Sequence, residues 1–363
     1  MGNSAKAVLL RWFLPVVLAV ATATDLLRGR ALQAWLPNPA VVSAISTLVF
    51  VIAITAIISQ VARVVGGRID KAEAERNLAQ KNLEILNENL EKTVEDRTQE
   101  LRLKNEQMEE ELLLARELQF AMLPKRFPSV PENAGSEESL LGFFTFYLPT
   151  SQVSGDFFNV FPVSDTSVGV LICDVMGHGV RAALVAGMMR AITEQHSDAD
   201  CDPGKLLARL NESLHSILSH SGTTMFATGL VIIVDAAHGR FSYASAGHPK
   251  PLHYRRARGQ TESLDGASGP ALGLFKEAQF KTAVAAIEPG DLLMMFTDGL
   301  FEVESPRAGL YSHADLVEEV RKHSGLPAKV MMEEVVREVR QFAGGSDFED
   351  DVCLVGIELR PQP

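Results

Sequence analysis

Four acidic positions in the chain have the residue types and neighbours that metal chemistry needs. They are Asp156 in SGDFFNVF, Asp174 in LICDVMGHG, Asp298 in MMFTDGLFE and the pair Asp350-Asp351 in FEDDVCLVGIEL. Each lies at the expected end of a strand, beside glycine or another acid. A carboxylate in such a place is costly unless it is paired or coordinates a metal. Because few basic residues lie near these motifs, we predict a site for hard divalent cations, Mg²⁺ or Mn²⁺.

The elements that would position these acids follow an α+β pattern from about residue 141. Apolar stretches predict strands over 143–148, 168–173, 225–234, 240–246, 292–297 and 352–359. Amphipathic stretches predict helices over 178–196, 203–219, 313–323 and 328–342. The helices fall between groups of strands and do not alternate with them one for one. This favours helices packed on antiparallel sheets over a doubly wound parallel fold.

The ordered motifs of this region resemble those of a known family. SGDFF, DVMGHG, ASAGHPKPL, GPALG, FTDGL and DDVCL are similar to motifs of the SpoIIE-like phosphatases, bacterial relatives of the type 2C metal-dependent Ser/Thr protein phosphatases. The upstream segment LLLARELQFAMLP resembles the helix that often precedes this domain in RsbU-type proteins. The resemblance covers about residues 112–360. It implies an antiparallel β-sandwich flanked by helices, with metals in a cleft at one end.

The resemblance also implies two ions, Mn²⁺ or Mg²⁺, and a set of ligands for them. Asp174 would bridge the ions, and Asp351, the neighbour of Asp350, ranks lower as a ligand. The implied ligands are Asp156, Asp174, the main-chain carbonyl of Val175, Asp298 and Asp350. Two close cations lower the pKa of a shared water and neutralise phosphoryl oxygens, so that the hydroxide attacks phosphorus in line.

Several neighbouring residues depart from the family pattern or invite a second interpretation. Asn159 stands where the family commonly has Asp, and Cys353 stands where Thr or Ser is usual. Neither is an assigned ligand, so we expect activity to survive. His178 is a weak candidate for proton transfer, since Met176 occupies the position that matches the eukaryotic catalytic histidine. His248 is expected to be a structural turn residue, with a substrate-facing role as the alternative.

The implied activity is hydrolysis of phosphoserine or phosphothreonine on a regulatory protein in bacterial signal transduction. In this family the substrate is often a small STAS-type anti-anti-sigma factor. One alternative is a catalytically silent scaffold, or pseudophosphatase, that binds a partner without hydrolysis. Another is a small-molecule phosphomonoesterase. The sequence names neither the substrate protein nor the activating signal.

The N-terminal residues 1–66 are predicted to anchor the chain in the inner (plasma) membrane. Residues 41–62 contain no charge and are long enough to cross the hydrocarbon core, although a buried core helix is an alternative. An earlier apolar stretch, about residues 8–27, is either another transmembrane helix or a cleaved signal peptide. Arg63, Arg68 and Lys71 follow residues 41–62, which places the C-terminal body in the cytoplasm.

Residues 67–123 are predicted to form a long helical linker. Apolar residues at heptad positions suggest a parallel coiled-coil homodimer, although Arg97 and Lys104 interrupt the seam, and a solvated single helix is the alternative. Pro124 ends the helix, residues 124–140 form a hinge loop, and residues 141–363 form the phosphatase domain. The net charge of −12 argues against nucleic-acid binding. Three separated cysteines argue against a disulfide framework.

Overall fold

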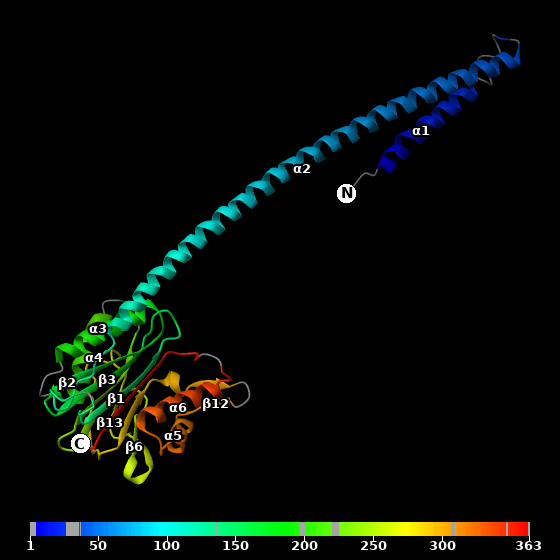
Figure 1. The fold of residues 1–363 in the computed structure, drawn as a ribbon. Helices are drawn as coiled ribbons and strands as arrows, with labels where there is room; N and C mark the ends of the chain where they lie inside the picture. The colour runs from blue at the N-terminus through cyan, green and yellow to red at the C-terminus, as the bar shows by residue number, and fades with distance from the viewer. Residues whose placement is uncertain are drawn as a thin grey trace. The chain divides into compact units, whose positions relative to one another are not determined.

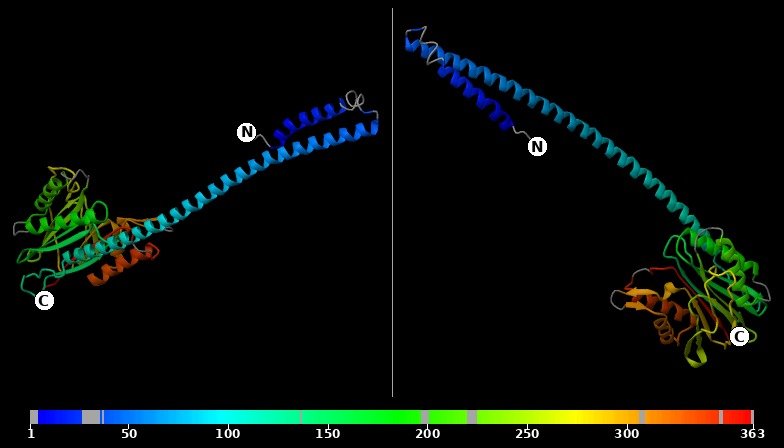
Figure 2. Two further views of the ribbon diagram at one scale, coloured as in Figure 1. Left: turned by 90° about the horizontal axis from the view of Figure 1, so that it is seen from above. Right: turned by 180° about the vertical axis from the view of Figure 1, so that it is seen from behind.

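The computed structural model describes residues 5–26, 36, 38–135, 137–196, 201–219, 225–305, 309–345 and 348–361 (Figures 1 and 2). The chain divides into two compact units, Met1–Lys104 and Asn105–Pro363. The second unit contains all the strands found in the described residues and all the sequence-predicted site residues.

Two helices account for most of the first unit. Helix α1 spans Ala5–Leu26 and includes Pro15. Helix α2 spans Pro39–Met122, so the predicted membrane segment and the predicted linker are one uninterrupted helix of 84 residues. By length and composition α2 contains a stretch that can cross a membrane, whereas the described apolar stretch of α1, Leu14–Leu26, is shorter. The helix ends two residues before Pro124, because proline lacks the N–H that helix continuation needs.

Two sheets packed face to face form the second unit. One has the order β1-β13-β10-β6-β7, with strands Leu141–Leu148, Val352–Leu359, Leu292–Phe296, Leu252–Arg255 and Gln260–Ser263. The other has the order β2-β3-β4-β5-β8, with strands Phe157–Ser164, Ser167–Val175, Ala227–Asp235, Arg240–Ala246 and Ser268–Gly269. Strand β9 (Ala283–Ala286) also pairs with β5, and β11 (Val303–Ser305) with β12 (Gly309–Tyr311). Of these strand pairs only β5 with β8 is parallel, so the predicted antiparallel α+β fold is confirmed.

Helices cover the outer face of each sheet. Helices α3 (Val180–His196) and α4 (Pro203–Ser219) share a hydrophobic cluster with the β2–β5 sheet. Helices α5 (His313–Lys322) and α6 (Ala328–Phe342) share another with β10 and β13. A third cluster fills the space between the sheets. The result is a four-layer arrangement, helices on sheet on sheet on helices, which Figure 1 shows from the side.

Strand β3 illustrates why the predicted strands are apolar along their whole length. Its residues alternate between the cluster between the sheets, which takes Val170 and Ile172, and the cluster under the helices, which takes Leu171 and Cys173. Both faces are buried, so neither can be polar. The strand pairs with β4 without interruption from Ser167 to Val175. Asp174 therefore lies at the end of a strand that is buried on both faces.

Candidate active site

Asp156 and Asp174 are brought together by the pairing of β2 with β3. The ladder begins at Phe157 opposite Cys173, which places the two acids on adjacent strands one step further along. A Cβ at Gly155 would lie 2.6 Å from the carbonyl oxygen of Val175. Only glycine therefore lets the chain approach Val175 this closely before it enters β2.

Asp298 and Asp350 are brought together by a second close approach. Asp298 begins the short 3₁₀ helix η3 (Asp298–Leu300), which follows β10. A Cβ at Gly299 would lie 2.2 Å from the carbonyl oxygen of Asp351 and 3.2 Å from that of Asp350. The glycine of the FTDGL motif thus lets η3 rest against the main chain of the acidic pair, which immediately precedes β13.

The electrostatics show that the four carboxylates share one region. Burial, and then the charge of Asp174, raise the pKa of Asp156 well above its usual range. Burial, and then the charges of Asp298 and Asp350, raise the pKa of Asp174 to about 7. Burial, and then the charge of Asp350, raise the pKa of Asp298. None of the ion pairs found among the described residues involves these four aspartates, so their mutual repulsion is not balanced by the chain.

The donor set fits hard divalent cations. It consists of carboxylates, with the Val175 carbonyl beside them, and such oxygen ligands suit Mg²⁺ and Mn²⁺. The four aspartates do not form any group of three, among the described residues, whose ligand atoms all lie within 4.8 Å of one another. Ligands that are divided between two ions need not all be mutual neighbours, and this spacing is compatible with such a division.

Thr297 is a positioning residue that the sequence interpretation missed. It is fully buried, and its hydroxyl donates a hydrogen bond of 2.7 Å to Oδ2 of Asp156. The same hydroxyl accepts one of 2.9 Å from the main-chain N–H of Cys353. Thr297 therefore fixes the Asp156 carboxylate from the opposite sheet. Its place next to Asp298 in FTDGL was the available signal.

Asp351 has a different environment from its neighbour Asp350. Its Oδ1 accepts hydrogen bonds from the main-chain N–H and the hydroxyl of Thr150, at 2.7 and 3.0 Å. Its Oδ2 accepts one from the N–H of Gly155 at 3.2 Å. Both oxygens of Asp351 are thus used to hold the loop that leads to Asp156.

The remaining sequence candidates lie in three environments. His178 is exposed in the loop between β3 and α3. His248 is buried, its Nδ1 is hydrogen-bonded to the Thr228 hydroxyl at 2.8 Å, and burial lowers its pKa to about 3. Asn159 and Cys353 are buried within strands. Of these residues only His178 is open to solvent.

The last turns of α2 are hydrogen-bonded to the loop that carries Asp156. The side-chain amide of Gln119 donates to the Ser154 carbonyl at 2.7 Å and accepts from the Ser154 N–H at 2.9 Å. Phe120 adds an edge-to-face contact with Tyr147, whose hydroxyl donates to the Asp156 carbonyl at 3.1 Å. The end of the helix is therefore part of the framework of the site.

With this geometry established, comparison with known proteins identifies the domain. The profile of the family described as Stage II sporulation protein E (SpoIIE) matches residues 164–360. The chain belongs to the SpoIIE family. Residues 164–360 exceed half of the chain, and the SpoIIE match agrees with the ordered motifs. The C-terminal domain is thus a serine/threonine phosphatase domain of the type 2C kind.

Two Bacillus subtilis phosphatases are about 25% identical to this chain over the residues that align. The phosphoserine phosphatase RsbP of Bacillus subtilis is 25% identical over 217 residues, which cover 60% of this chain and 52% of RsbP. The match therefore spans about half the length of that relative. The phosphoserine phosphatase RsbU of the same organism is 26% identical over 264 residues, which cover 72% of this chain and 74% of RsbU.

Solved structures support the fold. The SiaA-PP2C domain of Pseudomonas aeruginosa aligns with a TM-score of 0.59 at 20% identity, covering 70% of this chain and 98% of that structure. The PP2C phosphatase domain of SpoIIE from Bacillus subtilis, with a fragment of its regulatory domain, aligns with a TM-score of 0.51 at 20% identity, covering 60% and 63%. At this identity the likeness concerns the type 2C fold alone.

Proposed function

We propose that the protein is a membrane-anchored, metal-dependent phosphatase that removes phosphate from phosphoserine or phosphothreonine on a regulatory protein. The observation that carries this proposal is the gathering of four unpaired carboxylates at the strand ends of a SpoIIE-family domain. Such a group is costly in a fold unless cations compensate it. An all-oxygen ligand set is what phosphoryl chemistry with Mg²⁺ or Mn²⁺ uses.

In this proposal Asp156, Asp174, Asp298, Asp350 and the Val175 carbonyl would hold two ions, with Asp174 between them. When bound, the ions supply charge for the phosphoryl oxygens and acidify water. The chain supplies the geometry. The Thr297 hydroxyl holds one oxygen of Asp156, which leaves the other oxygen free for a ligand role. The Asp351 carboxylate holds the loop before Asp156 by accepting a hydrogen bond from the main-chain N–H of Gly155.

The proposed substrate is a small phosphorylated regulatory protein, such as a STAS-type anti-anti-sigma factor. Support comes from RsbP and RsbU, both of which are named phosphoserine phosphatases. The loop of Met176, Gly177 and His178, which begins two residues after Asp174, is exposed. An exposed loop beside the site suits contact with a folded protein substrate.

We also propose that α1 and α2 anchor the chain in the inner (plasma) membrane, with the phosphatase domain in the cytoplasm. The apolar N-terminal part of α2 supports the anchor. Dimerisation through α2 is a further part of the proposal. The heptad residues along α2 are all largely exposed in the single chain, and a parallel partner helix would cover them. They include Leu83, Leu90, Val94, Leu101, Met108 and Leu118.

The test is phosphate release by a soluble fragment that begins at about residue 70. Para-nitrophenyl phosphate is the first substrate, with and without Mn²⁺, and Asp174→Ala is the matched variant. We expect Mn²⁺-dependent turnover that the variant loses. Asp265→Asn, at an exposed aspartate outside the site, serves as the control and retains activity. Phosphopeptides and nucleotides are then compared to separate a protein phosphatase from a small-molecule phosphomonoesterase.

Absence of turnover in a folded fragment leads to a Mn²⁺ titration. A domain that binds Mn²⁺ but does not turn over is a phosphatase held inactive in the absence of its signal. A domain that neither binds Mn²⁺ nor releases phosphate is a scaffold, and this result would refute the proposed activity.

A further inference from the structure

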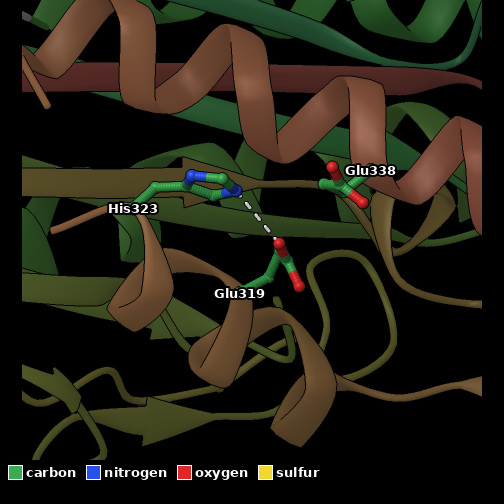
Figure 3. Close-up of side chains that lie close together, drawn as sticks. All are labelled: Glu319, His323 and Glu338. Atoms are coloured by element: carbon green, nitrogen blue, oxygen red, sulfur yellow. Dashed lines mark hydrogen bonds and ion pairs between the residues drawn. The ribbon is translucent and has the colours of Figure 1, made fainter.

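A second cluster of ligand-type side chains, which includes none of the four aspartates, lies where α5 packs on α6. It consists of Glu319 in the last turn of α5, His323 directly after that helix, and Glu338 on α6. One ligand atom from each lies within 4.8 Å of the other two, and no other such group of three was found in the described part of the chain. Figure 3 shows the three side chains converging from the two helices. We refer to them as the α5–α6 cluster.

The spacing within the α5–α6 cluster is close to that of a coordination shell. Glu319 and His323 are four residues apart, which places them on one face of the helix. His323 Nε2 lies 3.0 Å from Glu319 Oε1. Adjacent ligands of a tetrahedral ion with bonds of about 2.0–2.1 Å are separated by roughly 3.3 Å. The ligand atom of Glu338 lies within 4.8 Å of the other two. Two ligands of one ion cannot be more than roughly 4.2 Å apart, so the Glu338 carboxylate would have to approach by about an ångström or two.

The charges around the cluster leave room for a cation. Lys322 pairs with Oε2 of Glu319 at 2.8 Å, so Oε1 remains on the His323 side. Arg337 pairs with Glu338 and also with Glu334 on α6. Both basic side chains are about half exposed, and solvent screens their attraction. Glu319 itself is only 8% exposed, and a partly screened lysine compensates a buried carboxylate incompletely.

A buried hydroxyl without a partner lies in a cavity that two members of the α5–α6 cluster also line. Tyr311 of β12 is only 6% exposed, and its hydroxyl makes no hydrogen bond to any residue that the structure describes. It lines a cavity of about 680 Å³ together with Glu319 and Glu338. Burial, and then the charge of Glu319, raise the pKa of Tyr311, so the hydroxyl remains a donor. An unsatisfied buried donor is costly and points to an absent acceptor.

We propose that Glu319, His323 and Glu338 bind a divalent transition-metal ion, with Zn²⁺ as the best match, at a site separate from the aspartates. Imidazole nitrogen and carboxylate oxygen are both ligands of Zn²⁺, whereas imidazole is a poor ligand for Mg²⁺. The fourth position would hold a water, which gives the Tyr311 hydroxyl its acceptor. An ion here ties α5 to α6 and to the β11–β12 hairpin, so its role is structural.

The test measures Zn²⁺ bound by the purified full-length protein in detergent, by equilibrium dialysis in excess Mg²⁺. The Mg²⁺ occupies the all-oxygen aspartate site and leaves an imidazole site free. We expect one Zn²⁺ per chain. His323→Ala and Glu338→Gln should each weaken Zn²⁺ binding at least tenfold. Tyr311→Phe should weaken it about tenfold, as loss of a supporting hydrogen bond does, while leaving the ion-free protein folded.

Two matched controls separate ligation from general charge effects. Glu334→Gln removes the other carboxylate that pairs with Arg337, and His238→Ala removes an exposed histidine that pairs with Asp235. Both should retain the Zn²⁺ of the wild type. The proposal is overturned if the wild type binds no Zn²⁺ in excess Mg²⁺, or if Glu338→Gln binds it as tightly as Glu334→Gln does. These readouts do not depend on phosphatase activity.

Discussion

Replacing Asp174 by asparagine is expected to stabilise the ion-free domain while abolishing catalysis. At pH 8 the Asp174 carboxyl is ionised in the fold, although its surroundings hold its pKa near 7. In the unfolded chain the carboxyl ionises at the usual value of 3.8. The fold therefore bears a penalty that the near-isosteric amide does not. At about 1.4 kcal/mol per factor of ten, the difference between these two values corresponds to roughly 4 kcal/mol.

The sign of this effect depends on pH. A carboxyl whose pKa is raised by folding costs no stability below pH 3.8 and bears the full penalty above pH 7. In EDTA, Asp174→Asn should therefore exceed the wild type in free energy of unfolding by up to about 4 kcal/mol at pH 8, and by far less at pH 5. Added Mn²⁺ should reverse the order, because ions stabilise the folded state that binds them.

The assay is urea unfolding of a fragment spanning residues 105–363, followed by circular dichroism and by tyrosine fluorescence, since both tryptophans lie before residue 105. Asp265→Asn is the control for removing one negative charge at an exposed site, and it should change stability by less than about 0.5 kcal/mol. If Asp174→Asn is no more stable than the wild type at pH 8 without ions, then the negative charges of the four site carboxylates do not destabilise the ion-free fold. In that case the argument for a cation site from burial and repulsion fails.

Three further changes test the framework of the site. Thr297→Val removes the hydroxyl that holds Asp156 and should lower the rate by about 10–100-fold with Mn²⁺ affinity reduced, as measured by phosphate release against Mn²⁺ concentration. Gly299→Ala places a methyl 2.2 Å from a main-chain oxygen and should cost about 3 kcal/mol of unfolding free energy, whereas Gly325→Ala, with open space around it, should not. The wild type is expected to lose about 2 kcal/mol of unfolding free energy between pH 6.5 and 5, because His248 stays neutral in the fold but is protonated in the unfolded chain. His248→Asn should abolish this part of the pH dependence, as measured by urea unfolding at the two pH values.

The elements with strong periodicity were predictable from the sequence. Helix α4 and strand β13 have the predicted bounds, 203–219 and 352–359, because each pairs a regular apolar pattern with clear turn residues at its ends. Strand β2 was missed as a strand. Its sequence contains Asn159 and Pro162, which weaken the apolar pattern. The proline is tolerated because β2 lies at the edge of its sheet.

The acids of the candidate site were predictable in type, and their supporting contacts were not. Asp174 stands out because a charge ends a fully apolar strand. By contrast, the hydrogen bond from Thr297 to Asp156 joins residues 141 positions apart. The local sequence pattern around either residue does not predict such a contact. The same holds for Asp351, whose distinction from Asp350 rests on Thr150 and Gly155, about 200 positions away. The ligand roles of Asp156, Asp174, Asp298 and Asp350 stay predictions until metal binding is measured.

The joint between Gln119 and Ser154 has a consequence for how such proteins can be recombined. Both atoms that Ser154 contributes to this joint belong to its main chain, while its buried hydroxyl accepts a hydrogen bond of 3.0 Å from the Asp156 N–H. Ser154 therefore connects the end of the helix, through Gln119, to the main chain of Asp156, and Phe120 adds its contact with Tyr147. A helix from an unrelated receptor, fused in phase just ahead of this glutamine, would meet the Asp156 loop through the same two hydrogen bonds. The domain is in this sense an exchangeable output module.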